Sequence, residues 1–121
     1  MKKEETIQNY LEAIYIVSLE KSNVRAIDIA TYLNFSRPTV SIALRQLEND
    51  GYIKVDDSSI TLTEKGMKIA TTMYERHEYI AKILMKLGVD KDTAYEDSCL
   101  IEHDLSVESF EAIKKATQNY I

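Results

Sequence analysis

The chain has 121 residues, a formal net charge of −5 and 45% hydrophobic residues. This length fits one compact domain, or a small domain joined to a dimerisation element that shares its core with a partner. No apolar run approaches the roughly 18 to 20 residues of a membrane span, and the charged start MKKEETIQNY lacks the apolar core of a secretion signal. We therefore expect a cytoplasmic protein with no membrane contact.

Charge and cysteine content narrow the function classes. The single cysteine, Cys99, excludes an internal disulfide and a Cys-rich structural zinc site. The acidic net charge argues against nucleic acid, because phosphate binding normally leaves a basic footprint. The charge is unevenly distributed, however: residues 36–47 carry Arg37 and Arg45 without an acidic residue, whereas residues 90–111 are strongly acidic. A DNA-reading surface is therefore compatible with an acidic body.

Apolar residues recur with helical spacing from the start of the chain. This spacing predicts a first helix over residues 4–19 and a short second helix over residues 26–33, in which Asp28 suits the positive end of the helix dipole. The residues expected to pack in the second helix are Ile27, Ala30, Tyr32 and Leu33. The segment NFS then predicts a turn.

A third helix is predicted over residues 36–50. Ser36 is the expected N-cap, and Pro38 is tolerated in the first turn because its missing N–H has no helical partner there. After Gly51 the apolar period changes to two, and the runs YIKV and ITLT predict a hairpin with the polar tip DDSS.

Helical spacing resumes after the hairpin. A long helix is expected from the cap residue Thr63 to the stop at Gly88, followed by helices over residues 91–103 and 107–120, the last capped by Ser106. The sequence thus predicts a mainly α protein with a small β-hairpin wing. We expect a winged helix-turn-helix DNA-binding domain over residues 1–63 and an all-helical dimerisation and metal-binding domain over residues 64–121.

A winged helix-turn-helix places its third helix in the DNA major groove and the hairpin tip beside the backbone. The exposed side chains of that helix offer hydroxyl, guanidinium and methyl groups to bases and phosphates, although an isolated helix with these residues would be read as a solvated face. The candidate DNA-binding residues are Arg25, Ser36, Arg37, Pro38, Thr39, Ser41, Ile42 and Arg45.

The segment CLIEHDLS places Cys99, Glu102 and His103 three and four residues apart, on one face of a helix. This is a metal-ligand spacing, and it is also the spacing of an ordinary polar stripe. An enzyme would use Cys99 as nucleophile and His103 as base. The sequence shows no oxyanion-stabilising glycine loop and no third orienting group, so we expect no enzyme activity.

Four segments resemble the diphtheria toxin repressor family, which includes the manganese transport regulators. They are TIQNYLEAIYIV, SRPTVSIALRQLENDGYI, LTEKGMKIA with the later YERHEYI, and CLIEHDLS. The resemblance implies a homodimer that binds a pseudo-palindromic DNA operator when Fe²⁺ or Mn²⁺ is present and represses metal-uptake genes. We expect the architecture of the short, two-domain members, since the sequence leaves no room after Tyr120 for an SH3-like domain.

The resemblance also implies a set of metal ligands. They are Asn9, Glu12, His77, Cys99, Glu102 and His103. Manganese-type members usually carry an aspartate where this chain has Asn9 and a glutamate where it has Cys99, the iron-type choice. A thiolate favours Fe²⁺ over Mn²⁺ and admits Co²⁺, Ni²⁺ or Zn²⁺ as substitutes. The ancillary site of the iron-type members is expected to be absent, since Ala81 and Tyr95 stand at two of its positions.

Taken singly, these residues have simpler roles. A cysteine is often an inert buried thiol, a lone histidine is usually hydrogen-bonded or on the surface, and a lone glutamate is usually solvated. The alternative is a winged-helix regulator that senses a non-metal ligand or acts independently of metal. Dimerisation is expected through residues 64–87 and 91–120, whose apolar side chains need a partner. These side chains are Ile80, Ile83, Leu84, Leu87, Val89, Leu100, Leu105 and Phe110.

Overall fold

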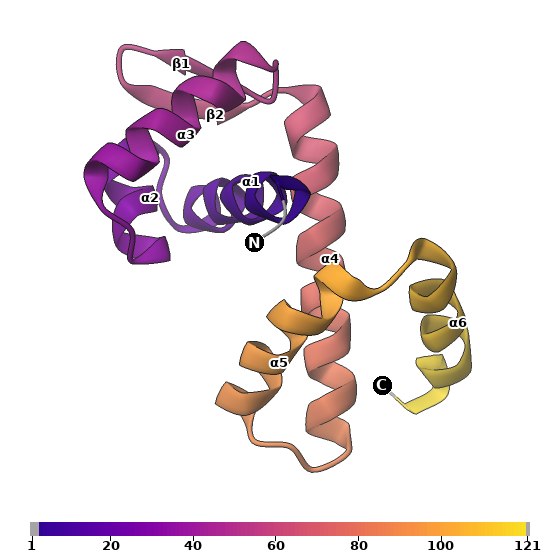
Figure 1. Ribbon diagram of the computed structural model, residues 1–121. Helices are drawn as coiled ribbons and strands as arrows, with labels where there is room; N and C mark the ends of the chain where they lie inside the picture. Colours follow the sequence, from indigo (N-terminus) through magenta and orange to yellow (C-terminus); the bar gives the residue numbers. More distant parts are fainter. Residues whose placement is uncertain (1–2, 121) are drawn as a thin grey trace. The chain divides into compact units, whose positions relative to one another are not determined.

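The computed structural model describes residues 3–120 and divides into two compact units between Thr72 and Met73. The described residues form six α-helices and one two-stranded antiparallel sheet, and Figure 1 shows how they are connected. The fold class predicted from the sequence, mainly helical with a hairpin wing, is confirmed. No helix among the described residues is long and apolar enough to cross a membrane.

The first unit is a helix-turn-helix with a wing. It contains α1 (Lys3–Glu20), α2 (Ala26–Leu33), α3 (Arg37–Asn49), β1 (Ile53–Asp56) and β2 (Ser59–Leu62). Apolar side chains from each of these elements form one core. Its most deeply buried members, all at most 3% exposed, are Tyr10, Leu11, Ile14, Val24, Ile29, Val40, Leu47, Ile53 and, from the helix after the wing, Ala70.

The buried face of the second helix was predicted only in part: Ala30 and Leu33 pack against the core as expected, but Ile27 and Tyr32 do not. Ile29 and Ala30 are buried, whereas Ile27 and Tyr32 are 44% and 49% exposed. Eight residues make about two turns, so periodicity alone fixes the buried face poorly. The start of α2 is held by Asp28, which accepts hydrogen bonds from Lys21 and from the Arg25 backbone N–H; these bonds lower the pKa of Asp28.

The third helix begins as predicted. The Ser36 hydroxyl oxygen accepts a hydrogen bond from the Thr39 backbone N–H, and Pro38 lies in the first turn. The hairpin that follows has Asp57 and Ser58 at its tip, both with positive φ, as a two-residue type I′ turn requires. The Ile60 N–H donates to the Val24 carbonyl, which ties the wing to the segment before α2.

The long helix α4 (Glu64–Lys86) begins in the first unit and ends in the second. Thr63 caps it, because its hydroxyl accepts from the Gly66 backbone N–H and donates to the carbonyls of Gly51 and Tyr52. Gly88, at φ +96°, ends the helix in the left-handed conformation that glycine favours.

Every secondary-structure element among the described residues of the second unit is a helix. It contains the later part of α4, α5 (Lys91–Asp104), α6 (Val107–Thr117) and a 3₁₀ turn over Gln118–Tyr120. Asp90 caps α5 and Ser106 caps α6, each with its side chain accepting a backbone N–H. The last predicted helix is therefore shorter than expected, since its final three residues form the 3₁₀ turn.

Gly66 allows the chain to turn tightly from the wing into α4. A Cβ at this position would collide with the Tyr52 backbone carbonyl oxygen, which cannot move away easily. We therefore predict that Gly66→Ala destabilises the protein by about 1 to 3 kcal/mol, although alanine is the better helix former by about 1 kcal/mol. Urea unfolding measures the change. Lys68→Ala, at an exposed position of the same helix, is the control, and a Gly66→Ala protein as stable as this control would contradict the prediction.

Candidate metal centre and nucleic-acid interface

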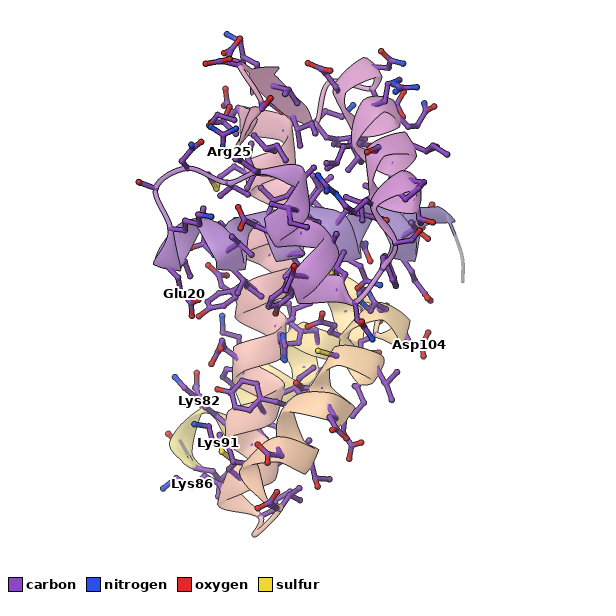
Figure 2. The ribbon with its side chains drawn as sticks, turned by 90° about the vertical axis from the view of Figure 1, so that its left-hand side faces the viewer. Glu20, Arg25, Lys82, Lys86, Lys91 and Asp104 are labelled. Atoms are coloured by element: carbon purple, nitrogen blue, oxygen red, sulfur yellow. The ribbon has the colours of Figure 1, made fainter. Side chains whose placement is uncertain are left out.

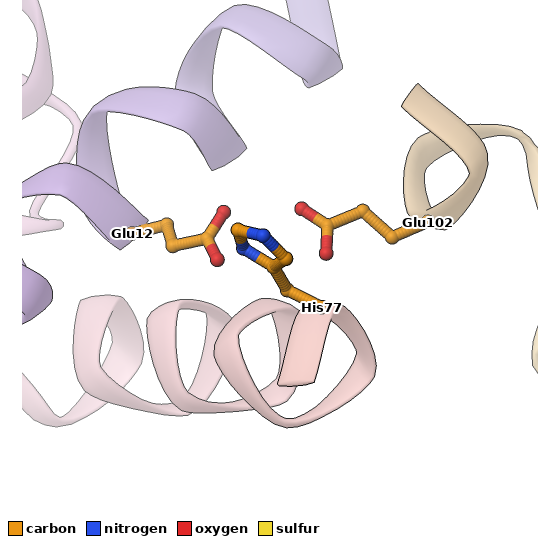
Figure 3. A group of neighbouring side chains, drawn as sticks. All are labelled: Glu12, His77 and Glu102. Carbon is orange, nitrogen blue, oxygen red and sulfur yellow. The ribbon is translucent and has the colours of Figure 1, made fainter. Parts of the chain in front are cut away.

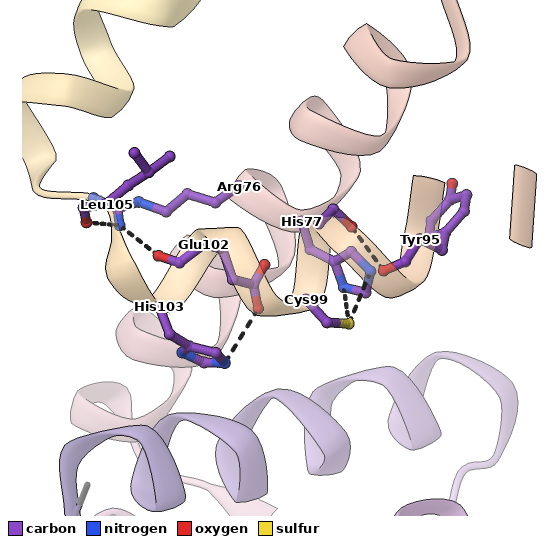
Figure 4. Close-up of polar contacts among 8 residues, drawn as sticks. Arg76, His77, Tyr95, Cys99, Glu102, His103 and Leu105 are labelled. Carbon is purple, nitrogen blue, oxygen red and sulfur yellow. Dashed lines mark hydrogen bonds and ion pairs between the residues drawn. The ribbon is translucent and has the colours of Figure 1, made fainter. Parts of the chain in front are cut away.

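Two helices of the second unit bring four of the predicted metal ligands into two close pairs, one of Cys99 with His77 and one of Glu102 with His103. His77 lies on α4, and Cys99, Glu102 and His103 lie on α5 (Figure 4). The Cys99 Sγ is 3.3 Å from the His77 Nε2, and the His103 Nε2 is 3.6 Å from the Glu102 Oε1. A ring nitrogen of His77 and a carboxylate oxygen of Glu102 lie within 4.8 Å of each other.

These four side chains differ in their access to solvent. The Glu102 residue is 0% exposed and His77 is 8% exposed, whereas His103 is half-buried and Cys99 is exposed. Burial of a carboxylate is costly unless a charge, a hydrogen bond or a metal compensates it. Packing alone therefore does not explain a fully buried glutamate close to two histidines.

The chemistry of the donor set fits a divalent transition metal. It offers one thiolate sulfur, two imidazole nitrogens and one carboxylate oxygen, and such ligands bind at about 2.0 to 2.3 Å from the ion. Two ligand atoms of one ion are then about 3 to 4.5 Å apart. The separations of 3.3 Å within the Cys99–His77 pair and 3.6 Å within the His103–Glu102 pair lie in this range.

The other two predicted ligands lie on α1 in the first unit. Glu12 is 6% exposed and lies between Leu11 and Ala13, which are buried apolar residues. Asn9 is half-buried one turn earlier on the same helix. Figure 3 draws Glu12 together with the two buried ligand candidates of the second unit, His77 and Glu102. A buried carboxylate within a run of apolar residues is again unusual for a side chain that serves only packing.

Tyr95 and Ala81 stand where iron-type relatives are expected to carry ancillary ligands. The Tyr95 hydroxyl donates to the Glu78 carboxylate at 2.8 Å, which raises the pKa of Tyr95, and its ring packs edge-on against the His77 ring. Ala81 is fully buried. Both residues therefore have structural roles next to His77.

The first unit presents a basic hollow of about 410 Å³ between α2, α3 and the wing. Arg25, Arg37 and Arg45 line it, together with Ser41 of α3 and Ser58 of the hairpin tip. Figure 2 labels Arg25, in the segment that precedes α2. Three guanidinium groups in one concave surface are suited to the phosphates of a DNA backbone.

The remaining DNA-binding candidates lie exposed on the first turns of α3. Ser36 and Thr39 are joined by their hydroxyl groups, Pro38 is exposed beside them, and Ile42 is 68% exposed. A large apolar side chain on an otherwise polar helix face is suited to contact with a thymine methyl group. The structure thus places all eight candidates in the first unit, with four of them around the hollow.

Sequence reasoning missed three residues of these two sites. Glu48 lines the hollow and accepts a hydrogen bond from the Val55 backbone N–H, so it ties α3 to the wing; Ser58 completes the lining. Arg76 is buried beside the metal candidates. A signal for Arg76 was present, because it falls on the same helical stripe as the buried Met73 and Ile80.

A winged helix-turn-helix with a basic reading face, followed by a helical unit with clustered metal donors, defines a DNA-binding regulator. The family comparisons agree. Residues 3–59 match the N-terminal DNA binding domain of iron dependent repressors, and residues 63–120 match the metal binding and dimerisation domain of the same repressors. The chain belongs to this family, whose members are DNA-binding transcriptional repressors and not enzymes.

Named relatives extend over almost the whole chain. A transcriptional regulator MntR of Lysinibacillus sphaericus is 32% identical over 114 residues, covering 93% of this chain and 82% of the relative. The MntR of Salmonella typhimurium is 33% identical over 119 residues, covering 98% of this chain and 76% of the relative.

Solved structures are similar in fold over 95% of this chain. The manganese regulator SloR has a TM-score of 0.81 and 28% identity, and a manganese-dependent transcriptional repressor in complex with manganese has a TM-score of 0.84 and 26% identity. The chain spans 54% and 53% of the lengths of these two proteins.

Arg45 lines the basic hollow and is exposed. We predict that Arg45→Gln weakens binding to duplex DNA and lowers the slope of log affinity against log salt by about one, as expected for one lost phosphate contact. The measurement is fluorescence anisotropy at several salt concentrations. Lys82→Gln removes the same charge from an exposed position of the second unit, and an equal loss of slope in this control would contradict the assignment.

Proposed function

We propose that the protein is a cytoplasmic repressor that binds its operator in response to a divalent metal and controls genes for metal uptake. The observation that carries the proposal is the cluster of His77, Cys99, Glu102 and His103, with its buried carboxylate. Residues 1–63 read DNA, and residues 64–121 bind metal and form the dimer. This division is supported by the family matches over residues 3–59 and 63–120.

The metal is held by ligands from both units. His77, Cys99, Glu102 and His103 bind it from the second unit, and Glu12 binds it from α1, with Asn9 as a neutral oxygen ligand. When bound, the metal would supply positive charge that compensates the buried carboxylates. The proposal for Glu12 is supported by its burial in an apolar stretch, and that for Asn9 by its place one turn earlier on the same helix.

The metal favoured by this donor set is Fe²⁺. The Cys99 thiolate is a softer ligand than the carboxylate it replaces, and Mn²⁺ prefers hard oxygen ligands. Mn²⁺ is the second candidate, supported by the manganese regulators among the relatives. Co²⁺, Ni²⁺ and Zn²⁺ would substitute in vitro, because imidazole and thiolate suit all three.

Metal binding acts by favouring one relative orientation of the two units. A ligand shifts such an equilibrium only through its differential affinity for the two states. A 100-fold preference for the DNA-competent state corresponds to about 2.7 kcal/mol of coupling. A coupling of this size is lost when a single strong ligand is removed, so each metal ligand is essential to the response.

The operator is a pseudo-palindrome read by two copies of α3. In winged and related helix-turn-helix dimers, half-site centres are about 10 base pairs, or a multiple of that, apart. The basic hollow meets the phosphates, and the exposed side chains of α3 meet the base edges. The alternative of a regulator that senses a non-metal ligand is not favoured, because the family match over the second unit is to a metal binding domain.

The second unit forms the homodimer. Ile80 and Phe110, which the sequence predicted to need a partner, are already buried within one chain, at 5% and 6% exposure. Other apolar side chains of this unit remain strongly exposed. They are Leu87 at 76%, Leu100 at 71%, Val107 at 68% and Tyr120 at 72%.

Sedimentation velocity tests the dimer. We predict a mass twice that of the 13.9 kDa chain at micromolar concentration, because burying the exposed apolar surface of the second unit against a second copy stabilises the dimer. Leu100→Glu places a charge in this surface and should give a monomer with unchanged helix content. Glu96→Gln, on the exposed face of the same helix, is the control. A monomeric wild type would contradict the prediction.

Two isosteric substitutions test the metal response. Glu102→Gln should lower metal affinity strongly and abolish metal-stimulated DNA binding while sparing weak metal-independent binding. Glu12→Gln should leave metal bound through the second unit, yet DNA affinity should no longer rise. The measurements are Co²⁺ calorimetry and titration with a duplex selected by the wild-type protein.

Glu96→Gln is the control for this comparison, since it removes an exposed carboxylate from the helix that carries Glu102. It should respond to metal as the wild type does. If both Glu102→Gln and Glu12→Gln also respond like the wild type, the clustered donors are only a polar face, and the regulator acts without metal at this site.

A further inference from the structure

Arg76 is a buried cation that is not among the metal ligands. Its residue is only 6% exposed, on the stripe of α4 that carries His77 as the next residue. A buried guanidinium is stable only where its N–H groups find acceptors, because the charge has lost its water. The acceptors that it uses therefore indicate what it holds in place.

Two backbone carbonyls at the end of α5 accept from Arg76. Its Nη1 donates to the Glu102 carbonyl at 3.3 Å and to the Leu105 carbonyl at 3.1 Å. The last carbonyls of a helix have no partner within the helix, and a cation at this end also suits the helix dipole. Arg76 thus caps the C-terminal turn of α5 from a neighbouring helix.

The guanidinium is itself held from a third helix. Its central carbon lies 5.1 Å from the centroid of the Phe110 ring, on α6, in a cation–π arrangement. Phe110 is 6% exposed and cannot easily move away. One side chain of α4 therefore connects the end of α5 to the start of α6.

The turn that Arg76 caps carries two of the proposed metal ligands. One capped carbonyl belongs to Glu102 itself, and His103 lies between the two capped residues. Figure 4 shows the guanidinium on the backbone oxygens, with the Glu102 carboxylate and the His103 ring extending away from it. Fixing the backbone of this turn fixes the points from which both side chains reach the metal.

We propose that Arg76 is a positioning residue for the metal centre, which holds the last turn of α5 so that Glu102 and His103 are presented as ligands before metal arrives. The inference rests on the proposed function of this site. Residues that orient metal ligands typically account for about 10- to 100-fold in metal affinity. Arg76 should act on affinity without contacting the metal.

The test compares Arg76→Met, Arg76→Lys and the control Lys82→Met in the full chain. Co²⁺ titration followed by absorption gives the affinity, and circular dichroism and thermal unfolding of the metal-free protein give fold and stability. We expect Arg76→Met to lower Co²⁺ affinity about 10- to 100-fold. Arg76→Lys should recover part of the loss, since an ammonium can still donate to a carbonyl. Lys82→Met, exposed on α4, should change nothing.

A purely structural role gives a different result. Arg76→Met would then lower the unfolding temperature of the metal-free protein, while the folded protein bound Co²⁺ as tightly as the wild type, and this would overturn the proposal. Should Arg76→Met not fold, Arg76→Lys is decisive: an unchanged Co²⁺ affinity overturns the proposal, and a reduced one supports it. A wild type that binds no Co²⁺ would instead refute the proposed function.

Discussion

The second unit depends on the burial of the Glu102 carboxylate. A charged group without solvent access must be compensated by its surroundings, and the surroundings of Glu102 come from two helices. His103 lies 3.6 Å from the carboxylate, His77 is within reach from α4, and Arg76 holds the backbone of the same residue. The packing of α4 against α5, which also buries Ile80, Ala81 and Ala94, thus places several polar side chains around one acidic side chain.

The first unit has a cationic surface although the chain as a whole is acidic. The chain carries a net charge of −5, yet its reading face must approach DNA phosphates. Arg25, Arg37 and Arg45 come from separate places in the sequence and converge around one hollow. The wing holds the walls of this hollow in place, because its Val55 N–H donates to the Glu48 carboxylate and its Ile60 N–H donates to the Val24 carbonyl. A locally cationic surface is therefore present on a chain whose total charge is negative.

Comparison of the sequence predictions with the structure separates local from long-range causes. The starts of α3, α4 and α6 were predicted correctly, because Ser36, Thr63 and Ser106 cap helices through their own nearby backbone N–H groups. In α2, Ile27 and Tyr32 were wrongly predicted to be buried, and Ile80 and Phe110 were assigned to a partner although their own chain buries them. These errors share a cause, since burial depends on neighbours that are distant in sequence.

The sequence by itself determined the order of the elements, the winged helix-turn-helix, and the candidate ligands on α5, because caps, periodicity and i, i+3, i+4 spacing act within a few residues. Only the tertiary structure decided that the Cys99 thiol contacts His77, that Glu102 loses all solvent, and that Arg76 caps the ligand turn. The reason is physical: these contacts join residues at least 22 positions apart, and their distances are set by how α4 and α5 pack rather than by spacing along either helix.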